Sequence, residues 1–146
     1  MKPAPKGWPR LTTAVFYEDA NRAIDWLCKA FGFEVQLKVE EGGRVVHSQL
    51  VFGEALVMVA EPTGKARDGY VTPAATPSSI GGKITQSIMI FVDDAEAHCA
   101  RARAAGAKIT YAPTVSDYGP DYWADKSYQA VDLDGHHWWF CERVRG

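Results

Sequence analysis

The sequence predicts an α+β fold made of two copies of one βαβββ module. One extended segment, one helix and three further extended segments follow each other twice along the 146 residues. Sliding the sequence by 75 positions places Asp19 on Asp94 and Thr12 on Ser87, and self-similarity at a fixed offset indicates an internal repeat. We therefore expect a single domain over residues 1–146, divided into module one (10–60), a linker (61–83) and module two (84–146).

Module one opens with a strand over residues 11–17 and continues with a helix. Asp19 is a typical N-cap, because its carboxylate can accept hydrogen bonds from the free amides of the first turn. Apolar residues then recur at helical spacing as far as Gly32, which favours the left-handed conformation that ends a helix. Two glycine-containing turn signals divide the remainder into three strands, at 34–40, 44–52 and 55–60.

Module two follows a linker that is rich in proline, glycine, serine and threonine. A strand (85–92), a capping aspartate at Asp94 and a helix (95–105) repeat the pattern of module one. Three strands are expected after the helix, and Asp134-Gly135 is a hairpin-turn signal between the last two; their ranges are 108–111, 127–133 and 136–142. We expect a loop at 112–126 that covers a ligand site or packs on a partner through its aromatic residues Tyr118, Tyr122 and Trp123.

Charge and composition exclude several classes of partner. Lys and Arg number 16 and Asp and Glu number 18, without a block of like charges, so we expect neither nucleic acid nor a membrane surface as a partner. No apolar run has the length of a secretion signal or a membrane span, which predicts a cytoplasmic protein. The three cysteines form no CxxC pair and are expected to be reduced packing residues rather than a disulfide framework or a zinc cluster.

Motifs at the same relative places in both halves carry a family resemblance. Module one has Tyr17-Glu18-Asp19-Ala20 before its helix and Phe31-Gly32-Phe33 after it, and module two has Val92-Asp93-Asp94-Ala95 and Ala104-Ala105-Gly106-Ala107. Near the end, residues 132–136 look like a DPxGH turn with Leu133 in place of the proline. In order and spacing the chain resembles the vicinal oxygen chelate superfamily, which includes glyoxalase I, extradiol dioxygenases and bleomycin resistance proteins. The resemblance implies a curved mixed sheet around a cavity, with the helices on its convex face.

The same resemblance bears on metal binding. In metal-dependent members the ligands come from the first and last strands of each module, and the matching positions here are Thr12, Val57 or Met58, Ser87 and Trp139. A catalytic divalent ion needs about three converging imidazole or carboxylate ligands, which hydroxyl, thioether and indole groups do not supply. The resemblance therefore implies a site without a metal or another cofactor, centred on Thr12, Ser87 and Trp139.

The adjacent histidines His136 and His137 suggest a metal site at first sight. Neighbours on a strand point to opposite faces, however, so the two side chains cannot bind one ion together. The family match directs one set of side chains toward the cavity (His137, Trp139 and Cys141) and the other toward the helices (His136, Trp138 and Phe140).

Two further groups have a structural interpretation. Asp132 and Asp134 could form an acid–base pair or bind calcium, but a hairpin turn accounts for them better. His98 lies in the second predicted helix without a partner nearby in the sequence, and we expect it to be a surface or helix-packing residue.

His47 is the remaining candidate for chemistry. In the strand at 44–52, Val46 and Leu50 are expected to face the helix, which leaves His47 and Gln49 toward the cavity. A neutral imidazole with an ordinary pKa of about 6.5 could act as an acid or a base, or donate a hydrogen bond to a ligand. No partner carboxylate is evident in the sequence, so the identity of a catalytic residue stays unknown.

Alternation along the first strand of each module predicts an apolar and aromatic cavity lining: Ser87, Met89 and Phe91 with Thr12, Ala14 and Phe16. Such a lining suits a flat organic ligand. The leading hypothesis is a metal-independent homodimer that binds a small aromatic or hydrophobic molecule through Thr12, His47, Gln49, Ser87, Trp123, His137 and Trp139. One alternative is a lyase, isomerase or dioxygenase of the same superfamily that acts through His47 or through an unrecognised metal site. Another is a structural module whose own side chains fill the cavity.

Overall fold

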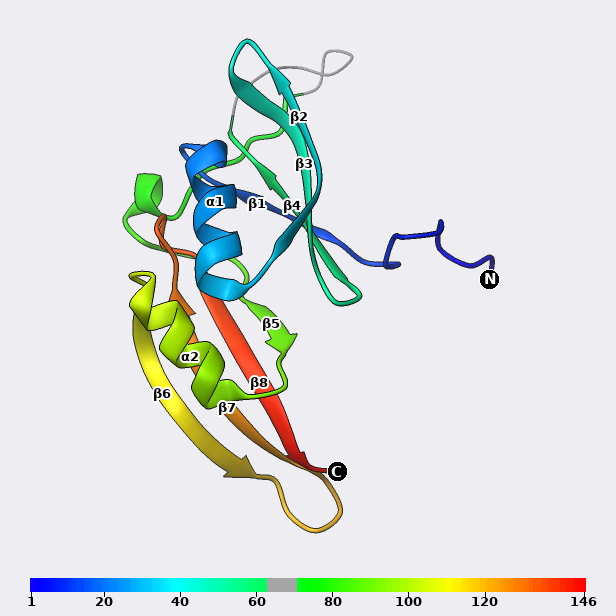
Figure 1. The fold of residues 1–146 in the computed structure, drawn as a ribbon, viewed down its shortest axis with the longest axis vertical. Coiled ribbons are helices and arrows are strands. Elements are labelled where there is room, and N and C mark those ends of the chain that lie inside the picture. The colour runs from blue at the N-terminus through cyan, green and yellow to red at the C-terminus, as the bar shows by residue number, and fades with distance from the viewer. Residues whose placement is uncertain (63–70) are drawn as a thin grey trace.

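The computed structural model describes residues 1–62 and 71–146, and it consists of two modules of one strand, one helix and three strands (Figure 1). In the part of the chain that is described, no helix combines the length and the apolar character needed to cross a membrane. The N-terminal segment extends away from the modules.

Module one forms a four-stranded mixed sheet in the order β1-β4-β3-β2, in which β1 and β4 are parallel and the other pairs are antiparallel. Its elements lie where the sequence predicts them: β1 (Thr13–Phe16), α1 (Ala20–Phe31), β2 (Glu34–Glu41), β3 (Arg44–Phe52) and β4 (Ala55–Ala60). The carboxylate of Asp19 accepts a hydrogen bond from the amide of Arg22 at 3.0 Å, and Gly32 ends the helix with φ 81°. The predicted capping residues of α1 are therefore confirmed.

Module two repeats this arrangement with the strand order β5-β8-β7-β6, and β5 and β8 are again the parallel pair. Its elements are β5 (Ile88–Phe91), α2 (Ala95–Ala104), β6 (Lys108–Asp117), β7 (Ala124–Val131) and β8 (His137–Arg145). Asp94 caps α2 as Asp19 caps α1. The matching strand order confirms the repeat that the 75-residue offset predicts. The linker carries a short 3-10 helix, η1 (Ser78–Ile80), and its residues 63–70 lie outside the described residues.

The predicted loop at 112–126 is largely wrong. Strand β6 continues to Asp117 and β7 begins at Ala124, so only residues 118–123 connect them. Register shifts interrupt the β6–β7 pairing near Tyr111, and Pro113 lies in β6, which is an edge strand of its sheet. Bulges break the regular alternation of a strand and an edge strand tolerates proline, so this segment carried the signals of a loop.

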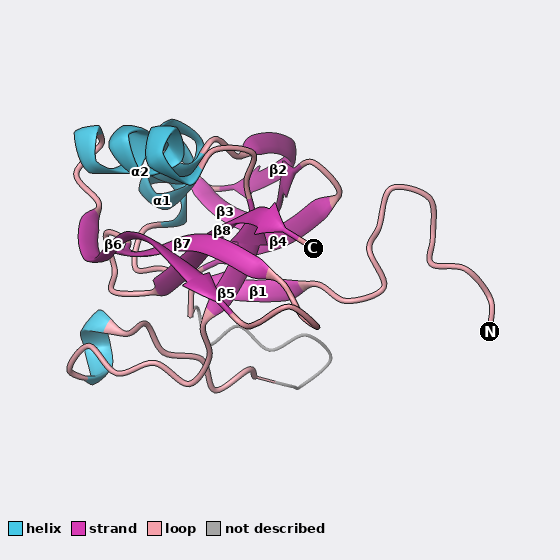
Figure 2. Cartoon of the chain, turned by 90° about the horizontal axis from the view of Figure 1, so that it is seen from below, coloured by secondary structure: helices cyan, strands magenta, loops and turns pink. Residues whose placement is uncertain are grey.

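Both helices lie on the same side of the strands, while η1 lies on the other side (Figure 2). One hydrophobic cluster joins the two modules beneath the helices. The ring of Phe31, from α1, lies 5.5 Å from that of Trp138 and 4.7 Å from that of Phe140, both from β8. All three side chains are fully buried. This shared core is consistent with the predicted convex helix layer over two curved sheets.

His98 of α2 adds polar bonds to this contact between the modules. Its Nε2 lies 2.8 Å from the carbonyl oxygen of Phe31, and because a carbonyl only accepts, Nε2 carries the hydrogen. Its Nδ1 then accepts from the hydroxyl of Tyr128. Burial lowers the pKa of His98 below its ordinary value, so the ring is neutral at neutral pH. The expected packing role is confirmed, and the two polar partners come from distant segments.

Candidate functional site

The sheet face of module two that points away from α2 is the first part of the candidate site. Parallel pairing places Met89 beside Trp139 and Phe91 beside Cys141. Since alternate residues of a strand point to opposite faces, the intervening Trp138 and Phe140 enter the core. Met89 and Phe91 are left 56% and 50% exposed, although both are large apolar side chains of the edge strand β5. The predicted alternation of β5 and β8 is confirmed.

These side chains line a hollow of about 540 Å³, called the module-two hollow below. Its wall is largely apolar and aromatic, with Met89, Phe91, Tyr111, Tyr118, Trp123 and Trp139, and its polar members are Ser116, Asp125, Ser127, Cys141 and Arg143. The rings of Tyr111 and Trp139 lie 5.5 Å apart and those of Tyr118 and Trp123 lie 5.8 Å apart. The hollow therefore offers several ring faces to a flat ligand.

An ion pair lies in the wall of this hollow. Arg143 donates from Nε to Oδ1 of Asp125 at 2.5 Å, and the two residues are partners in the β7–β8 register. The guanidinium carbon also lies 5.3 Å from the centre of the Phe91 ring and 5.2 Å from that of Trp123. Asp125 is only 8% exposed. The pair thus places one positive and one negative group at fixed positions beside aromatic rings.

Sequence reasoning missed both members of this pair. Alternation along β8 was a usable signal for Arg143, because it lies four residues after Trp139 and so shares its face. The direction of the Asp125 side chain could not be predicted, because this residue fell in the segment predicted as a loop.

Cys141 faces the hollow, as predicted, but its thiol is occupied. The hydroxyl of Ser127 contacts its sulfur at 3.1 Å, and burial raises the pKa of the thiol above its ordinary value. A protonated, buried thiol is a poor nucleophile. Cys141 is therefore part of the lining rather than a reactive group.

The structure brings two of the predicted ligand-binding residues, Trp123 and Trp139, together in the module-two hollow. His137 lies at the start of β8, with Nδ1 3.3 Å from Oε1 of Gln129, and does not line the hollow. Ser87 precedes β5, is exposed, and does not line it either.

The module-one residues form a separate group. Thr12 donates its hydroxyl hydrogen to the carbonyl of Leu56 at 2.8 Å and lines a smaller hollow of about 380 Å³. His47 and Gln49 lie on β3 with their Nε2 atoms 3.0 Å apart, and because an amide nitrogen donates, Nε2 of His47 is the acceptor. Neither Thr12, His47 nor Gln49 lines the module-two hollow. Within one chain the predicted site residues are thus divided between the two modules.

One predicted side-chain direction in β3 is wrong. Val39 pairs with His47 but Glu40 pairs with Val45, so Val46 is an extra, bulged residue. Val45 is consequently 3% exposed and joins the core, whereas Val46, expected to face the helix, is 45% exposed. The bulge reverses the alternation before His47 and leaves it intact after this residue.

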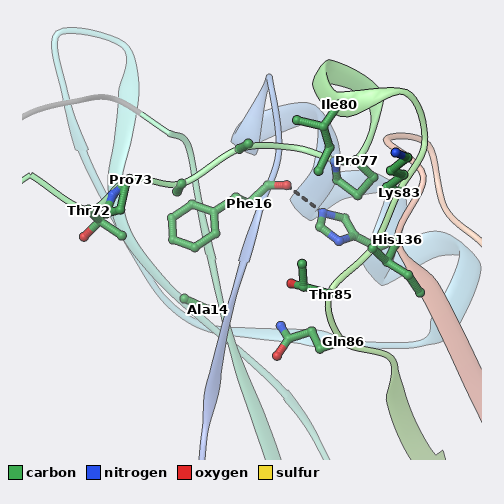
Figure 3. Close-up of a pocket in the computed structure, with 13 residues that line it drawn as sticks. Ala14, Phe16, Thr72, Pro73, Pro77, Ile80, Lys83, Thr85, Gln86 and His136 are labelled. Carbon is green, nitrogen blue, oxygen red and sulfur yellow. Dashed lines mark hydrogen bonds between the residues drawn. The ribbon is translucent and has the colours of Figure 1, made fainter.

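A third hollow, of about 420 Å³, lies where the segment 72–86 passes β1 (Figure 3). Phe16 and Ala14 form one wall, and Pro77, Lys83 and His136 are among the residues of the others. His136 donates from Nε2 to the carbonyl oxygen of Phe16 at 2.6 Å. It therefore lies under the linker and not in the helix layer, because it belongs to the turn before β8 rather than to the strand. His136 and His137 have separate partners, as their adjacency predicts.

The strand pairing resolves which residue of β4 occupies the metal-ligand position of the metal-dependent relatives. Ala14 pairs with Met58 as Met89 pairs with Trp139, while Val57 is buried in the core. The positions that the resemblance implies then become Thr12, Met58, Ser87 and Trp139, and none of these side chains offers an imidazole or a carboxylate. Within residues 1–62 and 71–146, no three His, Cys, Asp or Glu side chains converge on a common point.

Comparison with known proteins agrees with this architecture. The sequence model of the Glyoxalase/Bleomycin resistance protein/Dioxygenase superfamily matches residues 11–140. An uncharacterized protein of Mycobacterium bovis, Mb0911c, is 31% identical over 139 residues, which is 94% of this chain and 85% of that protein. The crystal structure of TioX from a Micromonospora species superimposes with a TM-score of 0.71 and 31% identity, covering 93% of this chain and 99% of TioX.

A third similar protein is TnmS3, an antibiotic binding protein from a Streptomyces species. It superimposes with a TM-score of 0.64 and 17% identity, over 91% of this chain and 93% of TnmS3. At this identity the likeness shows a common fold and no more.

Proposed function

The chain belongs to the Glyoxalase/Bleomycin resistance protein/Dioxygenase superfamily, and we propose that it binds a small, flat aromatic or hydrophobic molecule in the module-two hollow without a metal ion. The observation that carries this proposal is the aromatic wall of the hollow, where Phe91, Trp123 and Trp139 stand beside the polar Asp125–Arg143 pair. Binding sites for small organic molecules are concave and mainly apolar, with few polar groups that orient the ligand.

The exposure of the wall also favours a binding role. Met89, Phe91 and Trp123 expose apolar surface that costs free energy in water, and covering it returns about 25 cal/mol per Å². TnmS3, which has the same fold, is an antibiotic binding protein. This supports, by analogy of fold alone, a small-molecule ligand.

The residues at the implied ligand positions support metal independence. The hydroxyl of Thr12 is bonded to the backbone, and Met58 and Trp139 present a thioether and an indole. None of these replaces an imidazole or a carboxylate on a catalytic ion. The proposed role therefore needs only shape, ring faces and hydrogen bonds, and would be carried out in the cytoplasm as the sequence predicts.

We further propose that the protein acts as a homodimer. The face of module one that carries His47 also exposes Leu37 and Val39, which pair with Gln49 and His47 across β2 and β3. Strand β2 is an edge of its sheet, and edge strands with apolar side chains favour association. A second copy would bring this face over the module-two hollow and reunite the two groups of predicted site residues.

The rival function is a lyase, isomerase or dioxygenase. One observation favours it: Gln49 donates to Nε2 of His47 and so orients an imidazole on a sheet face. No carboxylate is bonded to this ring among the described residues, which weakens the case for a general base.

A ligand screen with matched variants tests the proposal. Aromatic metabolites and antibiotics are screened by thermal shift against the wild type, Trp139→Ala, His47→Ala and Trp8→Ala, the last at an exposed tryptophan that does not line the hollow. We expect a ligand that raises the melting temperature of the wild type and of Trp8→Ala, that binds Trp139→Ala at least about tenfold more weakly, and that is not converted. Turnover of a ligand that is lost in His47→Ala would instead establish the enzyme.

A further inference from the structure

The Asp125–Arg143 pair narrows the ligand class, and we propose that it selects an uncharged planar aromatic molecule that carries a carbonyl oxygen at the edge of its ring. This inference rests on the proposed function, because it concerns the same module-two hollow. Arg143 would donate to the carbonyl oxygen while the neighbouring rings pack against the ligand.

The guanidinium of Arg143 is held on three sides. The carboxylate of Asp125 accepts a hydrogen bond from Nε. The ring centres of Phe91 and Trp123 lie 5.3 Å and 5.2 Å from the central carbon of the guanidinium. Among the residues that the structure describes, Arg143 has no side-chain hydrogen bond besides the one through Nε. The terminal nitrogens are thus the donors that stay available to a ligand, and their positions are set before it binds.

The charge balance of the hollow decides which acceptor fits. The arginine and the aspartate among its lining residues, Arg143 and Asp125, form an ion pair, so their charges cancel. Burial raises the pKa of the Cys141 thiol above its ordinary value, so this group adds no charge at neutral pH. A carboxylate on the ligand would be repelled by the nearly buried carboxylate of Asp125, and an ammonium group would be repelled by the guanidinium of Arg143. A neutral carbonyl oxygen accepts from the guanidinium without either repulsion and without moving a net charge out of water.

The arrangement of the aromatic rings in the wall favours a particular shape for the apolar part of the ligand. The ring of Tyr111 is tilted by 60° against Trp139, and that of Tyr118 by 51° against Trp123. Tilted rings around an open face contact a flat molecule by both stacking and edge contacts. The wall therefore favours a planar ring system over an extended aliphatic chain.

The experiment uses three probes that share one ring system: methyl 2-naphthoate with a neutral carbonyl, 2-naphthoate with a negative charge, and 2-ethylnaphthalene with no acceptor. Each is titrated into the full-length protein, and quenching of tryptophan fluorescence gives its affinity. For the wild type we expect the methyl ester to bind about tenfold more tightly than either of the other two, which corresponds to one hydrogen bond to a charged donor.

Variants of Asp125 and Arg143 test whether this pair causes the preference for the methyl ester. Arg143→Met leaves the carboxylate of Asp125 without its partner, so it is combined with Asp125→Asn to keep the protein folded. We expect the double variant to bind the ester and 2-ethylnaphthalene equally. In Asp125→Asn alone, the side-chain oxygen of the asparagine still accepts from Nε of Arg143, but the negative charge is gone and the hollow has a net positive charge. We therefore expect 2-naphthoate, which is negatively charged, to bind most tightly of the three probes. Arg103→Met, on the exposed side of α2, is the control and should keep the wild-type order.

The outcomes separate the two proposals. If all three probes bind the wild type equally, or if Asp125→Asn leaves their order unchanged, the selective role of the pair is wrong while the proposed binding function stands. If none of the three probes quenches the wild type, the module-two hollow does not bind flat aromatic molecules and both proposals are overturned.

Discussion

Tyr17, directly after β1, donates its hydroxyl hydrogen at 2.7 Å to Oδ2 of Asp132, in the turn between β7 and β8. Both side chains are buried. The same oxygen accepts from Nε1 of Trp138 at 2.9 Å, and the other carboxylate oxygen accepts from the backbone amides of Asp134 and His136. Both carboxylate oxygens of Asp132 thus accept hydrogen bonds, and Asp132 is a structural clamp between the modules, which confirms the turn interpretation.

Removal of the Tyr17 hydroxyl tests this clamp. Tyr17→Phe leaves the buried carboxylate with one donor fewer, so we expect the free energy of unfolding in urea to fall by about 1–3 kcal/mol. Tyr122→Phe, which alters an exposed hydroxyl in the 118–123 loop, is the control and should change it by less than about 0.5 kcal/mol. Equal stability of Tyr17→Phe and the wild type would show that the clamp does not matter.

The neutral His98 predicts a dependence of stability on pH. Burial depresses its pKa in the folded state, so the unfolded chain takes up a proton at a higher pH than the folded protein does. This contribution to stability is present above the ordinary pKa of about 6.5 and is lost as the pH falls through the lower, folded value. We expect the free energy of unfolding, measured in urea, to fall between pH 7.5 and pH 5 more in the wild type than in His98→Gln. The same pH dependence in both proteins would contradict this role.

The glycines that end the two helices provide a matched pair. Gly32 and Gly106 both have positive φ, but a Cβ on Gly32 would lie 2.9 Å from Nη1 of Arg101, whereas Gly106 has open space. Arg101 donates to the carbonyls of Cys28 and Lys29 at the end of α1, so displacing it removes a cap. We expect alanine at either position to cost about 1 kcal/mol for its backbone conformation, and Gly32→Ala to be the more destabilising of the two in thermal melts. The reverse order would mean that the Arg101 contact is unimportant.

The proposed dimer interface is tested by a charge on the exposed face of module one. Wild-type protein is expected to sediment as a dimer, and Leu37→Glu as a monomer, because a carboxylate cannot be buried against an apolar face without a partner. Ala100→Glu adds the same charge on the exposed side of α2 and should stay dimeric. A monomeric wild type in analytical ultracentrifugation would rule out the dimer.

The sequence predicts most of the fold because its strongest signals are local. Asp19, Asp94 and Gly32 define helix ends within a few residues, and the turn signals at Gly43 and Gly53 give the bounds of β3 and β4. The loop prediction at 112–126 failed because bulges and Pro113 disturb the alternation on which strand prediction depends.

The polar network and the charged pair of the hollow were harder to predict. Asp132 bonds Tyr17, which is 115 residues earlier, and His98 bonds Phe31, which is 67 residues earlier. Nothing in the local pattern of a single sequence reveals such partners. Arg143 shares the face of Trp139 and was predictable in principle, but its partner Asp125 needed the β7–β8 register.

The central claim is that the module-two hollow binds a flat aromatic ligand without a metal ion. It is tested most directly by titrating methyl 2-naphthoate into protein that has been treated with EDTA, before and after addition of Mn²⁺, Ni²⁺, Zn²⁺ or Fe²⁺, with tryptophan quenching as the readout. We predict the same affinity in all of these titrations and a loss of binding in Trp139→Ala. Binding that appears only after a metal is added would contradict the claim.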